Sequence, residues 1–491
     1  MYRKDWASKW AEYTPNKVAV KEYRPARSLT YQELNNQANS LAHYLVHDLK
    51  VGKGERLMVL AEHSIEYVAL FSMTQKTGIT LVPVNFRLSG SEIDYLISDS
   101  EPRLLIAERK FADLVSFLKA NIEILWLDDL FPQLNNSEHQ RFEAVELEED
   151  HPAFILYTSG STGFPKGAIY SHKMLLWNSL NTSQSLEITP ADLTINCMPP
   201  FHTGGWNVLV TPMLHRGATI GLMNKFDPDF LLELMEQEKS NLFMGVPTML
   251  KMMADSEKFK SVSLDAMRYF IVGGEALPLE VIDTWHRKGV KIRQGYGLTE
   301  VGPNLTSLHQ DDAEQKIGSI GKPNFYVEYK IVDEQGRRVE PNEVGEFCLK
   351  GPMVTPGYWR NEEASQKAIV DGWFHTGDLV KEDNDGYLYV VDRKKCMFIS
   401  GGENVYPAEI ERVLRAVYGV DEAAVIGVKD AKWGEVGKAF VTMKPGCSFS
   451  ESLLREHCAN HLAKFKVPRY FEVLDELPKN GSGKIDRKNL A

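Results

Sequence analysis

The chain has 491 residues, of which 43% are hydrophobic and 25% are charged, and its formal net charge is −11. This length exceeds that of one ordinary domain, so more than one core is expected. The acidic balance argues against a nucleic-acid-binding protein, whose affinity depends on a basic face. No run approaches about 18 consecutive apolar residues, and the first residues contain no apolar signal core, so we expect a cytoplasmic protein without a transmembrane segment.

Short apolar runs alternate with amphipathic stretches in the first part of the chain. Residues 56–61 and 79–83 indicate strands on either side of a helix at 64–76, with Gly78 as the break. Similar runs follow at 103–107, 122–126, 153–156, 218–222 and 269–272, with a helix at 229–239 that Asp227-Pro228 starts. This alternation predicts parallel sheets covered by helices.

After about residue 320 the pattern changes to strands and turns, at 326–332, 345–349 and 387–391. The last part has its own pattern, with helices at 408–418 and 452–461 and strands at 423–428 and 439–444. We therefore predict an α/β protein with a large N-terminal domain, residues 1–392, of helix-covered mixed β-sheets plus a β-rich subdomain. A small mobile α+β C-terminal domain, residues 393–491, follows.

The cysteines are widely spaced and show neither a C-x-x-C pair nor metal-ligand spacing, so we expect reduced packing residues. They are Cys197, Cys348, Cys396, Cys447 and Cys458.

Residues 157–167 have the sequence Tyr-Thr-Ser-Gly-Ser-Thr-Gly-Phe-Pro-Lys-Gly and directly follow the apolar run 153–156. A strand that ends here delivers the loop to the carboxyl edge of a sheet, where N–H groups, hydroxyls and an ammonium can surround phosphate oxygens. The loop is not a Walker A motif, because Pro165 stands where a glycine is required and Gly167 where Ser or Thr is required. It predicts another kind of nucleotide triphosphate site.

Thr158 to Gly167 resembles the phosphate loop of the adenylate-forming superfamily, which contains acyl-CoA synthetases, peptide-synthetase adenylation domains and firefly luciferase. The resemblance extends from about residue 10 to Lys488 and implies ATP, Mg²⁺ and CoA as cofactor and co-substrates. The implied phosphate-loop residues are Thr158, Ser159, Gly160, Ser161, Thr162, Gly163 and Lys166.

Gly295 to Glu300 resembles the superfamily's Tyr-Gly-x-Thr-Glu element. The resemblance implies that Thr299 contacts the triphosphate, that Glu300 holds the magnesium ion, and that Tyr296, beside Gly297, lies against the adenine. A hard cation suits a carboxylate oxygen together with phosphates and water. The opposite wall of the adenine site is implied to be Gly274, Glu275 and Ala276.

Two further elements complete the nucleotide site. Trp373 to Asp378 resembles the Thr-Gly-Asp element, in which Asp378 would bind the ribose hydroxyls together with Arg393. Pro478 to Arg487 resembles the C-terminal loop that carries the catalytic lysine, here Lys484.

The resemblance also implies a second conformation. The small domain would rotate about a hinge near Lys395, so that Lys484 leaves the site and the loop Ser400–Pro407 enters it. Gly401 and Gly402 would then border the channel for the pantetheine arm of CoA, where a thin chain passes close to backbone.

The acid side is identified with Pro199 to Asn207, where His202 would lie beside the reacting carboxylate and Trp206 would act as a substrate gate. We predict a medium- to long-chain fatty acyl-CoA synthetase that forms acyl-AMP and pyrophosphate and then passes the acyl group to CoA, with release of AMP. The predicted catalytic residues are Lys484, His202, Thr299 and Glu300.

Other functions remain open. Within the superfamily they are an aryl-CoA or o-succinylbenzoyl-CoA ligase and a luciferase-like oxygenase. From another class, a non-catalytic adenylate-binding protein would keep the fold but lose Lys484, Glu300 or Asp378, and all three are present. Peripheral membrane contact and a homodimer are both compatible with the sequence, and no nucleic-acid partner is expected.

Overall fold

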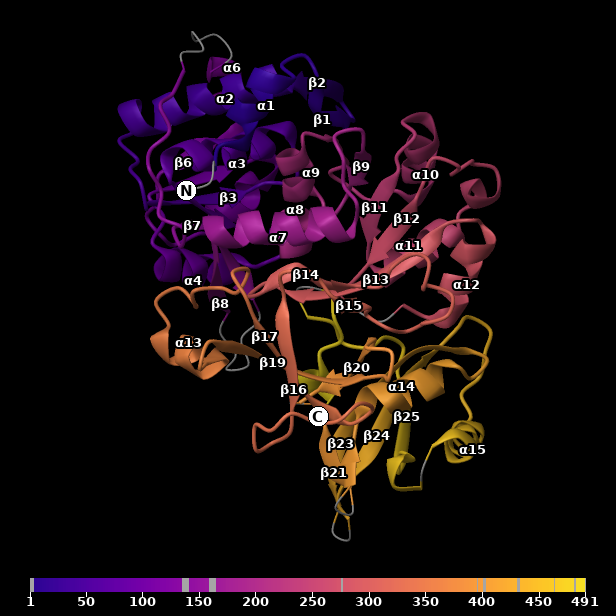
Figure 1. The fold of residues 1–491 in the computed structure, drawn as a ribbon. Coiled ribbons are helices and arrows are strands. Elements are labelled where there is room, and N and C mark those ends of the chain that lie inside the picture. Colours follow the sequence, from indigo (N-terminus) through magenta and orange to yellow (C-terminus); the bar gives the residue numbers. More distant parts are fainter. Residues whose placement is uncertain are drawn as a thin grey trace. The chain divides into compact units, whose positions relative to one another are not determined.

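The computed structural model describes residues 4–134, 141–158, 165–274, 277–394, 396–400, 403–430, 433–462, 464–480 and 483–490. The chain divides into two compact units. The first comprises Met1–Tyr329 and Leu349–Phe374, and the second comprises Lys330–Cys348 and His375–Ala491. The chain passes between them within strands β16 (Glu328–Val332), β17 (Val344–Lys350) and β19 (Trp373–Glu382), which Figure 1 labels.

One sheet of the first unit has the strand order β6-β5-β3-β4-β7-β8. Its parallel strands are β3 (Arg56–Leu60), β4 (Thr80–Pro83), β5 (Leu104–Ala107), β6 (Ile124–Trp126) and β7 (Pro152–Thr158). Strand β8 (Lys166–Ser171) instead runs antiparallel to β7. The strands β3, β4 and β5 consist almost entirely of buried apolar residues, as expected for a parallel sheet covered on both faces.

The predicted strand, helix and strand between residues 56 and 83 are confirmed. Helix α3 (Ile65–Thr77) begins at Ser64, whose side chain accepts a hydrogen bond from Tyr67 N, and it ends at Gly78. Gly78 has a φ of +71°, and a Cβ there would lie 2.6 Å from Leu147 Cδ2. Glycine is therefore required both by the backbone and by the space.

A second sheet of this unit has the order β15-β14-β13-β12-β11-β9-β10-β1-β2. Its parallel strands are β1 (Val18–Tyr23), β10 (Thr219–Leu222), β9 (Leu193–Asn196), β11 (Leu242–Gly245), β12 (Tyr269–Val272) and β13 (Lys291–Leu298). Antiparallel strands lie at both edges, namely β2 (Ala26–Thr30), β14 (Gly302–Ser307) and β15 (Lys322–Pro323). The prediction of parallel sheets thus holds for the central strands, and the mixed character predicted for the domain is confirmed.

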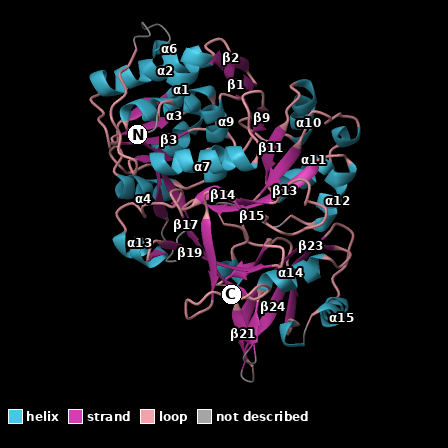
Figure 2. Ribbon diagram, in the orientation of Figure 1, coloured by secondary structure: helices cyan, strands magenta, loops and turns pink. Residues whose placement is uncertain are grey.

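Helices accompany the strands of the first unit, as the cyan ribbons of Figure 2 show. Helix α7 (His172–Ser185) packs against α9 (Val210–Arg216) and β14. Helix α10 (Pro228–Gln237) begins at Asp227, whose side chain accepts from Phe230 N, so the predicted start signal is confirmed. The other helices are α1 (Trp6–Tyr13), α2 (Tyr31–His43), α4 (Gly90–Ser100), α5 (Ala112–Ser116), α6 (Leu127–Leu134), α8 (Thr203–Asn207), α11 (Pro247–Ala254), α12 (Leu279–Arg287) and α13 (Glu362–Ala368).

The second unit contains a sheet of order β22-β21-β24-β23, with β25 beside β24. Its core includes Phe398, Ile410 and Val425, from the sheet and from helix α14. The predicted α+β content is confirmed. The boundary after residue 392 was predicted as the start of a mobile domain, and it stays a prediction. The elements are β20 (Leu388–Arg393), β21 (Phe398–Ser400), β22 (Glu403–Val405), α14 (Pro407–Arg415), β23 (Val420–Asp430), β24 (Gly434–Met443), α15 (Glu451–His461) and β25 (Tyr470–Val473).

Across the described ranges of both units, no helix is both long enough and apolar enough to cross a membrane.

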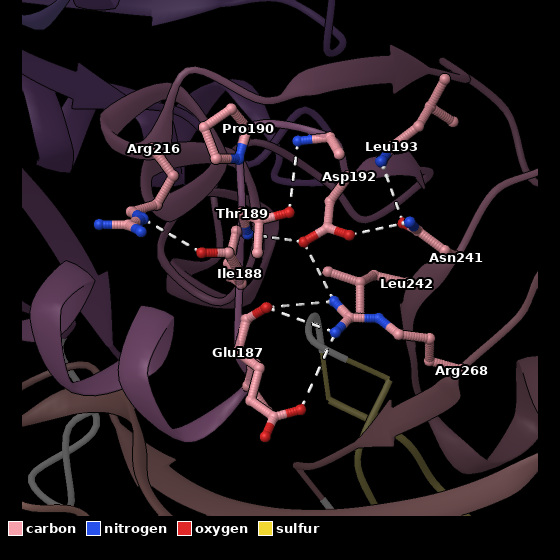
Figure 3. A network of polar contacts seen from close by, with 12 residues as sticks. Glu187, Ile188, Thr189, Pro190, Asp192, Leu193, Arg216, Asn241, Leu242 and Arg268 are labelled. Carbon is pink, nitrogen blue, oxygen red and sulfur yellow. Dashed lines mark hydrogen bonds and ion pairs between the residues drawn. The ribbon is translucent and has the colours of Figure 1, made fainter.

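A polar network links residues at the amino-terminal edge of the second sheet of the first unit, which we call the central sheet (Figure 3). Asp192, Asn241 and Arg268 each directly precede a strand, β9, β11 and β12 respectively, and parallel strands begin at the same edge. The buried carboxylate of Asp192 accepts from Asn241 Nδ2 at 2.8 Å, Arg268 Nη2 at 3.0 Å and Thr189 N at 2.7 Å. Arg268 also donates to Glu187 O. The network fixes the starts of three neighbouring strands.

We predict that Asp192→Ala lowers the free energy of unfolding by about 3 kcal/mol, because Arg268 and Asn241 lose a buried charged partner. Urea denaturation followed by tryptophan fluorescence measures this loss. The control Asp265→Ala removes an exposed carboxylate and should change stability by less than about 0.5 kcal/mol. Equal effects of the two substitutions would contradict the role of the network.

Candidate active site

The ends of the predicted phosphate loop are paired strands. Thr158 and Lys166 are cross-strand partners in the β7–β8 hairpin, so their side chains lie on the same face of the sheet. Gly167 admits no side chain, because a Cβ there would lie 2.6 Å from Ile155 Cγ2. The predicted residues between them, Ser159, Gly160, Ser161, Thr162 and Gly163, lie outside the described ranges. A residue with a hydroxyl and a residue with an ammonium group thus lie opposite each other at the carboxyl end of β7.

Residues 355–359, which we call the strap, run alongside β8. Trp359 N donates to Gly167 O at 2.7 Å, and Ile169 N donates to Gly357 O at 3.1 Å. These bonds fix the strap to the strand that leaves the phosphate loop. No sequence motif indicated a role for this segment.

The strap also binds Glu300, the predicted magnesium ligand. Thr355 N donates to Glu300 O at 2.7 Å, and Tyr358 Oη donates to Glu300 Oε1 at 2.9 Å. Lys166 Nζ lies 5.5 Å from the centroid of the Tyr358 ring. Burial, and then the neighbouring Glu300, raise the pKa of Tyr358 well above its ordinary value, so the hydroxyl keeps its proton and donates. Lys166, Tyr358 and Glu300 therefore lie close together within the first unit.

The predicted adenine residues lie at the carboxyl ends of β12 and β13. Strand β13 continues through Leu298, because Gly295, Tyr296 and Leu298 pair with β14. A Cβ on Gly297 would collide with the backbone of the facing strand, so only glycine fits there. Gly274 follows β12 with a φ of +89°, and Tyr296 lies in the neighbouring strand β13.

Thr299 and Glu300 lie in the turn between β13 and β14. This turn carries both predicted phosphate-side residues of the element on one short connection. Two other predicted adenine-wall residues, Glu275 and Ala276, lie outside the described ranges.

In the second unit the predicted ribose residues form an ion pair. Asp378 and Arg393 are cross-strand partners in β19 and β20, and Arg393 Nε lies 2.8 Å from Asp378 Oδ1. Asp378 is buried, whereas Arg393 is exposed. Gly377, which directly precedes Asp378 within β19, has a φ of +68°. The structure thus brings together the two residues assigned to the ribose, at the same end of the β19–β20 ladder.

Glu346 supports this part of β19, and no sequence motif pointed to it. Its carboxylate accepts from Gly377 N at 3.2 Å and from Lys394 Nζ at 3.1 Å, and it lies 3.5 Å from His375 Nδ1. Burial by itself raises the pKa of Glu346. Lys394 and His375 together lower it by more than burial raises it, so the pKa lies below its ordinary value. No local pattern could reveal this residue, because its partners come from other strands.

Lys484 stands on a tight turn at the end of the second unit. Lys484 N donates to Asn480 Oδ1 at 3.1 Å, and Gly483 has a φ of +84°. The next residue, Ile485, packs beside a small core of the β23–β24 sheet, and Arg487 bonds to the buried carboxylate of Glu411 at 2.7 Å. The turn therefore presents an exposed lysine from a firmly anchored base.

The remaining predicted residues of this unit are the hinge Lys395 and the CoA-channel residues Gly401 and Gly402. All three lie outside the described ranges, so their roles stay predictions.

On the predicted acid side, His202 immediately precedes α8 and Trp206 lies within it. Trp206 has no exposed surface, and its Nε1 donates to Pro200 O at 2.8 Å. Its ring packs among His63, Tyr67, Phe71 and Phe154, with centroid separations of 4.5 to 5.6 Å. The ring is thus part of the packed core, and its role as a gate stays a prediction.

His63 was not singled out from the sequence. Its Nε2 lies 3.2 Å from Gly205 O, and burial lowers its pKa to about 4, so the ring is neutral at pH 7. Within the described part of the chain, His63 Nδ1 and Tyr67 Oη have no hydrogen-bond partner. These polar atoms lie directly beside the segment that carries His202 and Trp206.

We predict that Trp206→Ala lowers the free energy of unfolding by about 3 to 5 kcal/mol, because it removes a fully buried ring from an aromatic cluster. Chemical denaturation measures the loss, with the partly exposed Trp433→Ala as the matched control. A cost below about 1 kcal/mol would show that the cluster can collapse around the gap and is not tightly packed.

Two protein-family models match the chain. The model described as AMP-binding enzyme matches residues 7–359, and the AMP-binding enzyme C-terminal domain matches residues 409–484. The chain belongs to the AMP-binding enzyme family. The predicted membership of the adenylate-forming superfamily is confirmed, and so is the prediction of an enzyme that is an AMP-forming CoA ligase.

Similar proteins cover nearly the whole chain. A feruloyl-CoA synthase of Amycolatopsis sp is 37% identical over 98% of this chain and 96% of its own length. The long-chain-fatty-acid–CoA ligase FadD13 of Mycobacterium tuberculosis is 34% identical over 97% of this chain and 95% of its own. The solved o-succinylbenzoate–CoA synthetase of Bacillus subtilis, in complex with ATP and a magnesium ion, has a TM-score of 0.88 at 30% identity and covers 99% of both chains.

The residues around Glu300 fit a magnesium ion that is held mostly by its substrate. No group of three or more His, Cys, Asp or Glu side chains able to hold a metal occurs within the described ranges. Mg²⁺ in nucleotide sites is commonly bound by one or two carboxylates plus phosphate and water oxygens. A single carboxylate, that of Glu300, whose partner Tyr358 also lies near Lys166, agrees with that mode of binding.

Proposed function

We propose that this protein is an AMP-forming acid–CoA ligase. In the first step a carboxylate oxygen attacks the α-phosphorus of ATP, and the bond to pyrophosphate breaks to leave acyl-AMP. In the second step the CoA thiolate attacks the acyl carbon, and AMP leaves. The family membership and the names of the relatives support both steps.

In the first step, this chain's residues position phosphates and balance charge. Lys166 and Thr299 would donate to phosphate oxygens, and Lys484 would hold the carboxylate and the α-phosphate together. A magnesium ion bound to Glu300 would supply positive charge to the triphosphate. Tyr296 and Gly274 would enclose the adenine, and Asp378 with Arg393 would bind the ribose.

For the second step we propose that the residues from 393 onward rotate about Lys395. This motion would withdraw Lys484 and bring Gly401 and Gly402 to the pantetheine arm. Two groups needed at different times could then use the same site.

The acid is proposed to be hydrophobic, and two classes are candidates. The relative named for a long-chain fatty acid supports the fatty acid predicted from the sequence. The relative named for feruloyl-CoA, at a slightly higher identity, supports an aromatic acid instead. The location in the cytoplasm, membrane contact and a homodimer also remain predictions.

One observation carries this proposal. Within a single compact unit, the Thr158–Lys166 pair at the base of the phosphate loop is linked through the strap to Glu300. This link between residues that carry a cation, a hydroxyl and a carboxylate supports the proposal that a metal–triphosphate complex binds there.

We predict carboxylate-dependent exchange of pyrophosphate into ATP. Acetate, benzoate, ferulate and palmitate are compared in this assay, and CoA is then added to test for the thioester. We expect exchange with ferulate or palmitate and little with acetate. An absence of exchange with every acid, under conditions where ATP binds, would instead favour the non-catalytic adenylate-binding protein.

Lys484→Ala should lower the rate of this exchange by about 10²- to 10³-fold, because the first step loses a positioned charged donor. Thioester formation from supplied acyl-adenylate should be largely retained, since Lys484 is proposed to be outside the site in that step. Lys488→Ala, an exposed lysine four residues on, is the control. Equal defects in both half-reactions would argue against alternate use of the small domain.

A further inference from the structure

Tyr358 is held in place by contacts that do not involve its hydroxyl. Its backbone forms an antiparallel bridge with Ala168, and Tyr358 N donates to Ser365 Oγ at 2.9 Å. Ser365 Oγ in turn donates to Asn361 O at 2.7 Å. The side chain therefore extends from a fixed backbone, and its ring lies beneath Lys166 Nζ.

Glu300, in contrast, is fixed by Thr355 only at its backbone. A Glu carboxylate rotates easily about its last torsion, which is broad and roughly two-fold. The Tyr358 hydroxyl, 2.9 Å from Oε1, is a contact that restrains this torsion. In metal sites, partners that bind the ligating group in this way set its orientation.

We propose that Tyr358 is a positioning residue that orients the Glu300 carboxylate for the metal of the metal–ATP complex, and that the strap ties this orientation to the phosphate hairpin. The inference deepens the proposed function and rests on it. Its structural basis is that one short segment contacts both β8, at Gly167 and Ile169, and Glu300.

A tyrosine that served only to pack the strap would behave differently. Its ring would matter and its hydroxyl would not, and any defect would be the same with and without metal. A positioning hydroxyl instead changes the metal-dependent part of nucleotide binding alone. The dependence of ATP binding on Mg²⁺ therefore separates the two roles.

The test measures ATP binding to the full chain by calorimetry, in EDTA and over a series of Mg²⁺ concentrations. Tyr358→Phe, which keeps the ring, should raise the Mg²⁺ concentration needed for half-maximal enhancement of binding by about 10- to 100-fold. Its affinity for ATP in EDTA should match that of the wild type. In a Glu300→Gln background, Tyr358→Phe should cause no further change, because its partner no longer has the metal-binding carboxylate.

Tyr31→Phe is the matched control, since it removes another buried hydroxyl, one that donates to Ala218 O at 2.7 Å far from Glu300 in the fold. It should leave the Mg²⁺ dependence unchanged. Thermal denaturation checks that each variant folds. If Tyr358→Phe does not fold, Ser365→Ala loosens the same strap without touching Glu300 and should shift the Mg²⁺ dependence in the same direction by a smaller factor.

A Mg²⁺ dependence of Tyr358→Phe identical to that of the wild type, or an equal loss with and without metal, would overturn the positioning role and leave the proposed function intact. A folded Ser365→Ala with an unchanged Mg²⁺ dependence would overturn it in the same way, should it be the variant measured. Failure of the wild type to bind ATP at any Mg²⁺ concentration would overturn the proposed function, and the positioning role with it.

Discussion

The pairing of Thr158 with Lys166 across the β7–β8 hairpin is the constraint on which the proposed chemistry depends. A lysine on a long loop would have many positions, and each would have to be restricted when a nucleotide binds. Here the lysine is the first residue of a strand, and the strand after it is bonded to the strap. The order that an anionic ligand needs is therefore already present in the backbone.

The two edges of the central sheet have different roles, one in stability and the other in the proposed binding of the ligand. At the amino-terminal edge, Asp192 and its partners fix the starts of β9, β11 and β12. At the carboxyl edge, β12 leads to Gly274 and the neighbouring strand β13 carries Tyr296, the residues proposed for the adenine. Ligands of open α/β sheets bind at the carboxyl ends of strands, which leaves the opposite edge to stability.

The sequence patterns predicted those features of the fold that depend on neighbouring residues in the chain. The strand–helix–strand around α3, with Gly78 at its end, and the start of α10 at Asp227 follow from periodicity and capping, so both could be predicted. The motif residues Asp378 and Arg393 lie far apart in sequence but are cross-strand partners, as expected if they share one ligand. The antiparallel edges β8 and β14 were not predicted, because pairing direction depends on the turn geometry and not on apolar content.

Residues that act through distant partners could not be found in this way. Tyr358 and Glu300 are 58 positions apart, and a tyrosine in a Pro-Gly-Tyr-Trp turn looks like a surface residue until its strand partner is known. Glu346 is similar, since Gly377 and Lys394 reach it from other strands. Trp206 is a different case, because its motif predicted a substrate gate, the structure shows a completely buried ring in the core, and the gate role stays a prediction.

A crystal structure of the protein with ATP and Mg²⁺ tests the central claim most directly. We expect the triphosphate between Lys166 and Glu300, the metal bound to the Glu300 carboxylate, and the Tyr358 hydroxyl still on Oε1. A nucleotide bound away from the β7–β8 hairpin, or a metal that Glu300 does not contact, would contradict the account.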